Sequence, residues 1–161
     1  MLRVAFFFLS LVLVLGYTLW RGGGPERSVA VLLLLAAAAT MLARPVGPNF
    51  IDVEIGVLLV DIALFLGLLA VAIQAERFWP LWMTALQGIV VAGHGAKAVN
   101  PHVIPWAYGA LLAFWAYPML ALLAVATWRH RQRLKRFGTD RSWTRSWLPF
   151  RDSRREAGPT S

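Results

Sequence analysis

The 161-residue sequence contains no cysteine, which excludes disulfide bonds, thiol chemistry and cysteine-ligated metal sites. It has only three histidines, and no serine–histidine–aspartate set, metal-ligand spacing or phosphate-binding loop is present. The glycine-rich segment around His94 lacks the spacing of a nucleotide-binding loop. We therefore expect neither an enzyme nor a bound cofactor or metal. The lack of cysteine leaves the redox compartment open.

Charged residues are also scarce. They make up 15% of the sequence and are missing from long stretches, whereas hydrophobic residues make up 58% and the mean hydropathy is +0.60. A water-soluble domain interleaves apolar residues with charges, but a membrane helix does not. We predict an all-α fold, a polytopic transmembrane helical bundle of about five spans with a short cytoplasmic amphipathic segment.

Glycine and proline mark the expected loops. Gly22–Pro25 separates the first two spans, and the short Gln74–Phe78 segment should make the third and fourth spans an antiparallel hairpin. The polar residues Gln87 and His94 lower the hydropathy of the fourth span, so a re-entrant segment is an alternative there. The predicted helical domain covers residues 1–128, with spans at about 4–20, 28–43, 52–74, 78–95 and 104–128, and residues 129–161 form a basic, partly disordered cytoplasmic tail.

Basic residues gather at the C-terminal end. Ten of the 16 Lys and Arg residues lie after Trp128 with three of the eight acidic residues, so this end carries +7 (ten minus three) of the net charge of +8. Because basic segments beside a span stay in the cytoplasm, we predict a cytoplasmic C-terminus and an outside N-terminus in the inner (plasma) membrane. Cleavage of the first span as a signal peptide would place the basic tail outside, so we favour an uncleaved span.

Asp61 is the most unusual residue of the predicted spans, because it lies near the middle of the third one. It is nine residues past Asp52, about 13 Å along a helix, where a carboxyl group is costly unless it faces other helices, finds a partner or stays protonated. Counting back from the Gln74–Phe78 turn places Asp61 at the level of Gln87 and His94. We predict a polar seam inside the bundle, formed by Glu54, Asp61, Gln87, His94 and Lys97.

Two explanations of the polar seam stay open. In one, Asp61 and His94 pass a proton or bind a cation from the outer side. In the other, which we favour, Asp61 is a hydrogen-bonded residue that fixes helix packing. Glu54 also fits a favourable interaction with the start of its own helix. A lone histidine at this depth does not supply the ligand set of a haem or metal site.

Tryptophan and arginine predict contacts with the membrane surface. Tryptophan rings prefer the interface, and a short helix after Asp140 would place tryptophans on one side and arginines on the other. The predicted interface residues are Trp79, Trp82, Trp128, Arg141, Trp143, Arg145 and Trp147. The alternative is a solvated tail that only fixes topology.

The sequence favours a small integral inner-membrane protein that acts as an accessory or assembly subunit through helix–helix and lipid contacts. Its expected partners are a bilayer with anionic head groups and a membrane protein or a second copy of the chain, with nucleic acid the least favoured. A small proton- or cation-linked transporter that uses Asp61 and His94 is the first alternative. A holin-like pore former is the second.

Overall fold

In a computed structural model of the chain, the structure describes residues 2–43, 55–99, 105–138, 140 and 143. These residues form five α-helices and no strand beyond an isolated antiparallel bridge between Ala75 and Trp143. The all-α prediction is therefore confirmed for the described part of the chain. The helices are α1 (Leu2–Arg21), α2 (Gly24–Ala43), α3 (Ile55–Gln74), α4 (Trp79–Val99) and α5 (Pro105–Phe137).

Short turns join the helices at one end of the molecule. Gly22 and Gly23 separate α1 from α2, and the Gly22 N–H donates to the Thr18 carbonyl oxygen at 2.7 Å, closing the last turn of α1. Pro25 lies in the first turn of α2, where its missing N–H is not needed. The predicted tight turn between the third and fourth helices is present, and α4 is one continuous helix.

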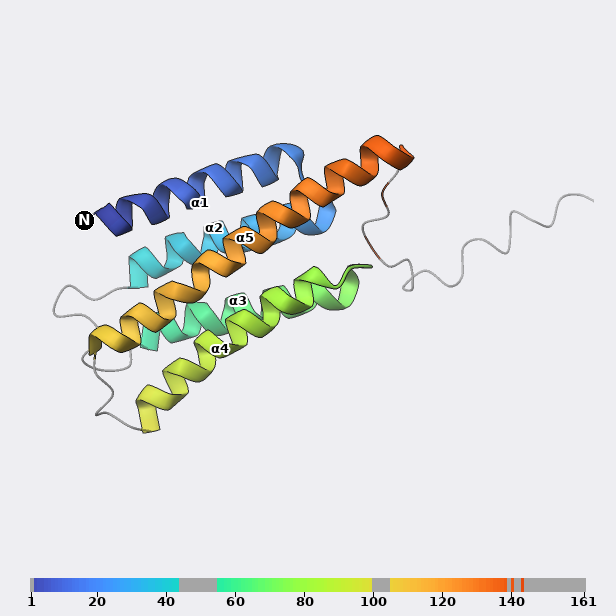
Figure 1. The fold of residues 1–161 in the computed structure, drawn as a ribbon. Coiled ribbons are helices and arrows are strands. Elements are labelled where there is room, and N and C mark those ends of the chain that lie inside the picture. Colours follow the sequence, from blue (N-terminus) through green and yellow to red (C-terminus); the bar gives the residue numbers. More distant parts are fainter. Residues whose placement is uncertain (1, 44–54, 100–104, 139, 141–142, 144–161) are drawn as a thin grey trace, which may run out of the picture.

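The five helices lie side by side with alternating direction (Figure 1). Each helix packs against the next one in the chain, and α5 packs against α1 to complete a ring. The α3–α4 contact is the most extensive, and α5 also contacts α2. The two short turns and the C-terminal end of α5 therefore gather at the same end of the bundle (Figure 1).

The interior of the ring is apolar. Leu68 of α3, Met83 of α4 and Leu123 of α5 are fully shielded from solvent, and Leu15 of α1 and Val29 of α2 complete the same core cluster. Burial of such side chains contributes about 1.5–3 kcal/mol each when they leave water. One contiguous core thus holds the five helices together.

The last helix is longer than predicted. The predicted span ended near Trp128, but α5 continues to Phe137 through the basic segment. Arg, Lys, Gln and Leu all favour helix, so nothing in this segment stops it. The helix ends where Gly138 adopts a φ of 70° and its N–H donates to the Leu134 carbonyl oxygen at 3.0 Å.

The predicted surface helix after Asp140 is wrong at Trp143, the one position within it that the structure describes. Trp143 pairs with Ala75 in a β-bridge, which belongs to extended chain and not to a helix. Asp140, expected to cap that helix, binds side chains of α5 and of the α3–α4 turn. Arg141, Arg145 and Trp147 lie outside the described residues.

Two helices of the described chain, α2 and α3, are long and apolar enough to cross a membrane, and α1 contains a shorter apolar stretch, Ala5–Arg21. The fourth helix carries Gln87, His94 and Lys97, and the fifth ends in a run of basic residues. A bundle of five membrane spans therefore stays a prediction.

We predict that Leu68→Ala destabilises the fold by about 2–5 kcal/mol, because it leaves a cavity between tightly packed helices. Leu66→Ala is the matched control on the same helix, since Leu66 is exposed, and it should change the free energy of unfolding by less than about 0.5 kcal/mol. Reversible unfolding in mixed detergent measures both. An equal loss of unfolding free energy in the two variants would show that Leu68 does not lie in the core.

Candidate functional site

Asp61 projects from α3 toward α4, where two side chains hold its carboxyl group. The Gln87 Nε2 amide donates to Asp61 Oδ1 at 2.9 Å, and His94 Nε2 lies 2.9 Å from Asp61 Oδ2. Gln87 Nε2 also donates to the Asp61 backbone carbonyl oxygen at 3.3 Å. Gln87 and His94 are buried, and Asp61 is mostly buried. We call these three residues the polar centre.

The local sequence explains why these side chains meet. Gln87 and His94 are seven residues apart and so share one face of α4. The short turn after Gln74 fixes how α4 runs back along α3, which sets Asp61 between them. The structure thus brings together three members of the polar seam at the register expected from the sequence.

The other two members of the polar seam are placed differently. Lys97 is buried near the end of α4, three residues beyond His94. Glu54, which the sequence placed level with Lys97, lies outside the described residues. The outer part of the polar seam is therefore defined only on α4.

A cavity of about 160 Å³ lies beside the polar centre. Asp61 and Gln87 are among its polar lining residues, and apolar side chains from all five helices form most of its wall, including Leu11, Leu33, Leu64, Val90 and Leu120. A volume of this size holds several water molecules at about 30 Å³ each. The carboxyl group therefore faces a space that water or a small ion is able to fill.

The polar centre has two chemical capacities. An imidazole and a carboxyl group at hydrogen-bond distance are able to share or pass a proton. Both Asp61 carboxyl oxygens also have partners on α4, so the cluster joins two helices without leaving a buried acceptor unsatisfied. Among the described residues, no group of three His, Asp or Glu side chains could hold a metal ion.

The predicted interface tryptophans differ in their surroundings. Trp82 and Trp128 are exposed. Trp79 is partly buried and packs against the core cluster, so part of its ring faces the interior of the bundle. Trp143 lies against Gly24 at the start of α2, where a side chain larger than hydrogen would collide with the indole.

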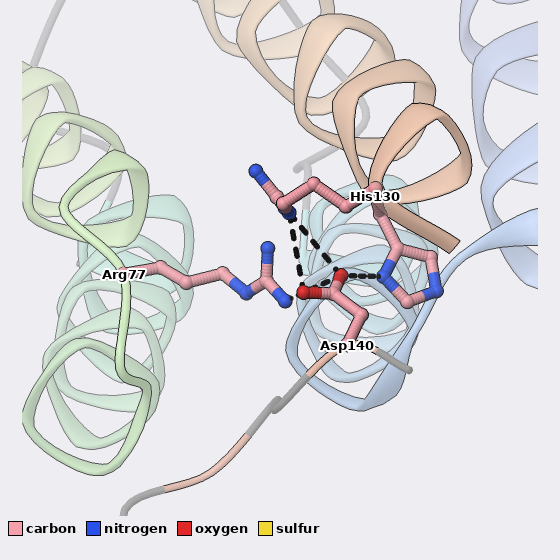
Figure 2. Close-up of polar contacts among 4 residues, drawn as sticks. Arg77, His130 and Asp140 are labelled. Atoms are coloured by element: carbon pink, nitrogen blue, oxygen red, sulfur yellow. Dashed lines mark hydrogen bonds and ion pairs between the residues drawn. The ribbon is translucent and has the colours of Figure 1, made fainter. Parts of the chain in front are cut away.

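A second polar cluster, which the sequence analysis missed, lies at the end of the bundle that carries the short turns (Figure 2). The Asp140 carboxyl group contacts three basic side chains: Arg77 Nη2 at 2.6 Å, His130 Nδ1 at 2.5 Å and Arg133 Nε at 3.2 Å. Arg77 belongs to the α3–α4 turn, and His130 and Arg133 belong to α5. We call these four residues the Asp140 network.

The Asp140 network ties the end of α5 to the α3–α4 turn. Asp140, Arg77 and His130 have less than a tenth of their side-chain surface exposed, and the nearby pairing of Trp143 with Ala75 joins the same two segments. One sequence signal was available, because Asp140 is the only acidic residue between Trp128 and Phe150. Nothing in the sequence indicated that Arg77, on the distant α3–α4 turn, is its partner.

Two more buried polar features were missed near the same end. The Thr18 and Thr127 hydroxyl oxygens lie 3.1 Å apart and join α1 to α5. Glu26 in the first turn of α2 is completely buried, and neither carboxyl oxygen has a hydrogen-bond partner among the described residues. The positive end of the α2 dipole favours an acid at this position.

Comparisons with known proteins find no matching family model, no similar curated protein and no similar solved structure.

We predict that Asp140→Asn lowers the free energy of unfolding by roughly 1–3 kcal/mol, because it removes the charge that buried Arg77 and His130 face. Glu76→Gln is the matched control, since Glu76 is an exposed acid in the same turn as Arg77, and it should have little effect. Thermal unfolding in detergent compares the two variants. A control variant as destabilised as Asp140→Asn would mean that net charge, and not the network, matters here.

Proposed function

We propose that the chain is an integral protein of the inner membrane, crossing it five times. The main support is that all five helices expose large apolar side chains, among them Leu13, Leu35, Leu66, Ile89 and Val125. In addition, only 17% of the apolar window of α2 and 28% of that of α3 are buried inside the bundle. The core helix of a soluble protein would be mostly buried, whereas lipid-facing helices expose apolar surface.

The proposed orientation is N-terminus outside and C-terminus in the cytoplasm. The end of the bundle with the two short turns and the end of α5 carries most of the basic residues of the described chain, including Arg21, Arg27 and Arg77. Basic residues beside spans mark the cytoplasmic side. Exposed Trp20 and Trp128 lie near this end, as expected for rings at a membrane surface.

Within the membrane, we propose a non-catalytic accessory or assembly role, exerted through helix–helix and lipid contacts. The observation that carries this proposal is that both oxygens of the mostly buried Asp61 carboxyl group have partners within the bundle. A carboxyl group satisfied in this way serves packing of α3 on α4. The apolar outer faces are then the surface available to another membrane protein or to a second copy of the chain.

A proton- or cation-linked transport role is the second candidate. One observation favours it: Asp61 and Gln87 line the cavity of about 160 Å³, so the carboxyl group is not sealed inside the α3–α4 contact. Intramembrane acids that face a cavity are common in proton and ion pathways.

The membrane proposal predicts a labelling pattern. Because the chain has no cysteine, a single cysteine at Glu76 or in the C-terminal tail can be compared with one at His102, which lies between α4 and α5 in the sequence. A membrane-impermeant maleimide applied to intact cells should label the loop variant and label the other two only after lysis. Labelling of the tail variant in intact cells would refute the orientation.

The two functional roles are separated by Asp61→Asn, which keeps the shape and removes the charge. The accessory role predicts no proton flux above empty vesicles for either the parent or the variant, and a gently extracted native complex much heavier than the 17.9 kDa chain. The transport role predicts flux, measured with an internal pH-sensitive dye, that Asp61→Asn abolishes. Leu66→Ala, which leaves the cavity intact, is the control for reconstitution.

A further inference from the structure

A cleft with a volume of about 600 Å³ lies where the α1–α2 turn meets α5. Its lining comes from the end of α1, the Gly22–Gly24 turn with the start of α2, and the C-terminal part of α5. Four lining side chains are positively charged: Arg21, Arg27, Arg131 and Lys135. None of the described residues that line it is acidic. We call this site the basic cleft.

The fold, and not only the composition, gathers these charges. Arg131 and Lys135 are four residues apart and share one face of α5. The imidazole of His130 lies directly against Gly23, where a Cβ would come within 2.7 Å of its Cε1, so the turn and α5 are in close contact. Arg21 and Arg27, on either side of the turn, are thereby set across from the α5 pair.

Two acidic residues of the described chain, Asp140 and Glu26, lie near the basic cleft, and neither lines it. The Asp140 carboxyl group is bound by Arg77, His130 and Arg133. Glu26 is completely buried and is not part of the lining. The described lining of the basic cleft therefore presents four cationic side chains and no acidic one. The N-terminus of α2 adds partial positive charge to the same wall.

An exposed aromatic ring at the edge of the basic cleft indicates the source of the anion. Trp20 lines the cleft with 73% of its surface exposed, and the Arg21 guanidinium carbon lies 4.1 Å from its ring centroid. Tryptophan at such a position is typical of the boundary between head groups and acyl chains. An anionic lipid is able to contact both the cationic side chains and the Trp20 ring, whereas a free phosphate ion contacts only the cationic side chains.

We propose that the basic cleft binds the phosphate group of an anionic phospholipid from the cytoplasmic leaflet. Arginine guanidinium groups pair with phosphate oxygens through two parallel hydrogen bonds, and lysine adds a point charge. This proposal rests on the proposed membrane location and adds to it a defined binding site. The bound lipid anchors the end of the bundle where α1, α2 and α5 meet.

The test compares two pairs of charge-removing substitutions on the same helix. Arg131→Gln with Lys135→Gln removes half of the cationic wall. Arg129→Gln with Arg136→Gln removes the same charge from exposed α5 positions that do not line the cleft. The purified full chain in uncharged detergent is titrated with phosphatidylglycerol, phosphatidylcholine and inorganic phosphate, and bound ligand is counted by native mass spectrometry.

The expected result is one saturable phosphatidylglycerol per chain, with weak binding of phosphatidylcholine and inorganic phosphate. The dissociation constant should rise about tenfold or more in the cleft pair and stay within about twofold in the control pair. Equal weakening in both pairs would show diffuse attraction to basic residues and overturn the site. Equal binding of inorganic phosphate and phosphatidylglycerol would overturn the lipid assignment.

Folding and membrane insertion are controlled separately. Both pairs are tested for cooperative thermal unfolding, and Arg27→Gln alone, on a different helix, replaces the cleft pair if that pair unfolds. It should weaken phosphatidylglycerol binding by several-fold, and unchanged binding would overturn the site. Alkaline carbonate extraction reports insertion. An inserted chain without the lipid site contradicts only this inference, whereas a chain that washes off the membrane contradicts the proposed function as well.

Discussion

The mostly buried carboxyl group of Asp61 is the constraint on which the packing of the helices depends. Asp61 lies in the middle of the most apolar part of the chain, and its desolvation is tolerable only if both oxygens find donors. From one face of α4, the Gln87 amide donates to one oxygen and His94 Nε2 lies within hydrogen-bond distance of the other. Any sliding of α4 by one turn along α3 would break both contacts, so the polar centre fixes the register of the most extensive helix pair.

Polar groups are distributed differently at the short-turn end of the bundle and in its middle. The end with the short turns concentrates charge in the Asp140 network and the basic cleft, and it joins three segments that are far apart in the sequence. The middle is almost entirely apolar except for the polar centre and its cavity. In a bilayer, this distribution places charges at a head-group layer and leaves one costly polar cluster in the hydrocarbon region.

The sequence predicted the five helices and the contact of Asp61 with Gln87 and His94. It did so because long apolar stretches define helices, and because a seven-residue spacing beside a short turn fixes both the face and the level of a side chain. It missed the Asp140 network, since Arg77 and Asp140 are 63 positions apart (140 minus 77) and only tertiary packing brings them together. It also ended the last helix too early, because charge after Trp128 indicates where a membrane span ends but not where a helix ends.

The central claim is that the outer apolar faces of this bundle contact lipid. Site-directed spin labels on single cysteines test it directly, because the parent chain has none. In liposomes, labels at exposed Leu66 and Val125 should collide often with oxygen and rarely with a water-soluble nickel chelate, and a label at buried Leu68 should collide rarely with both. Frequent nickel collisions at Leu66 and Val125 would place these faces in water and contradict the account.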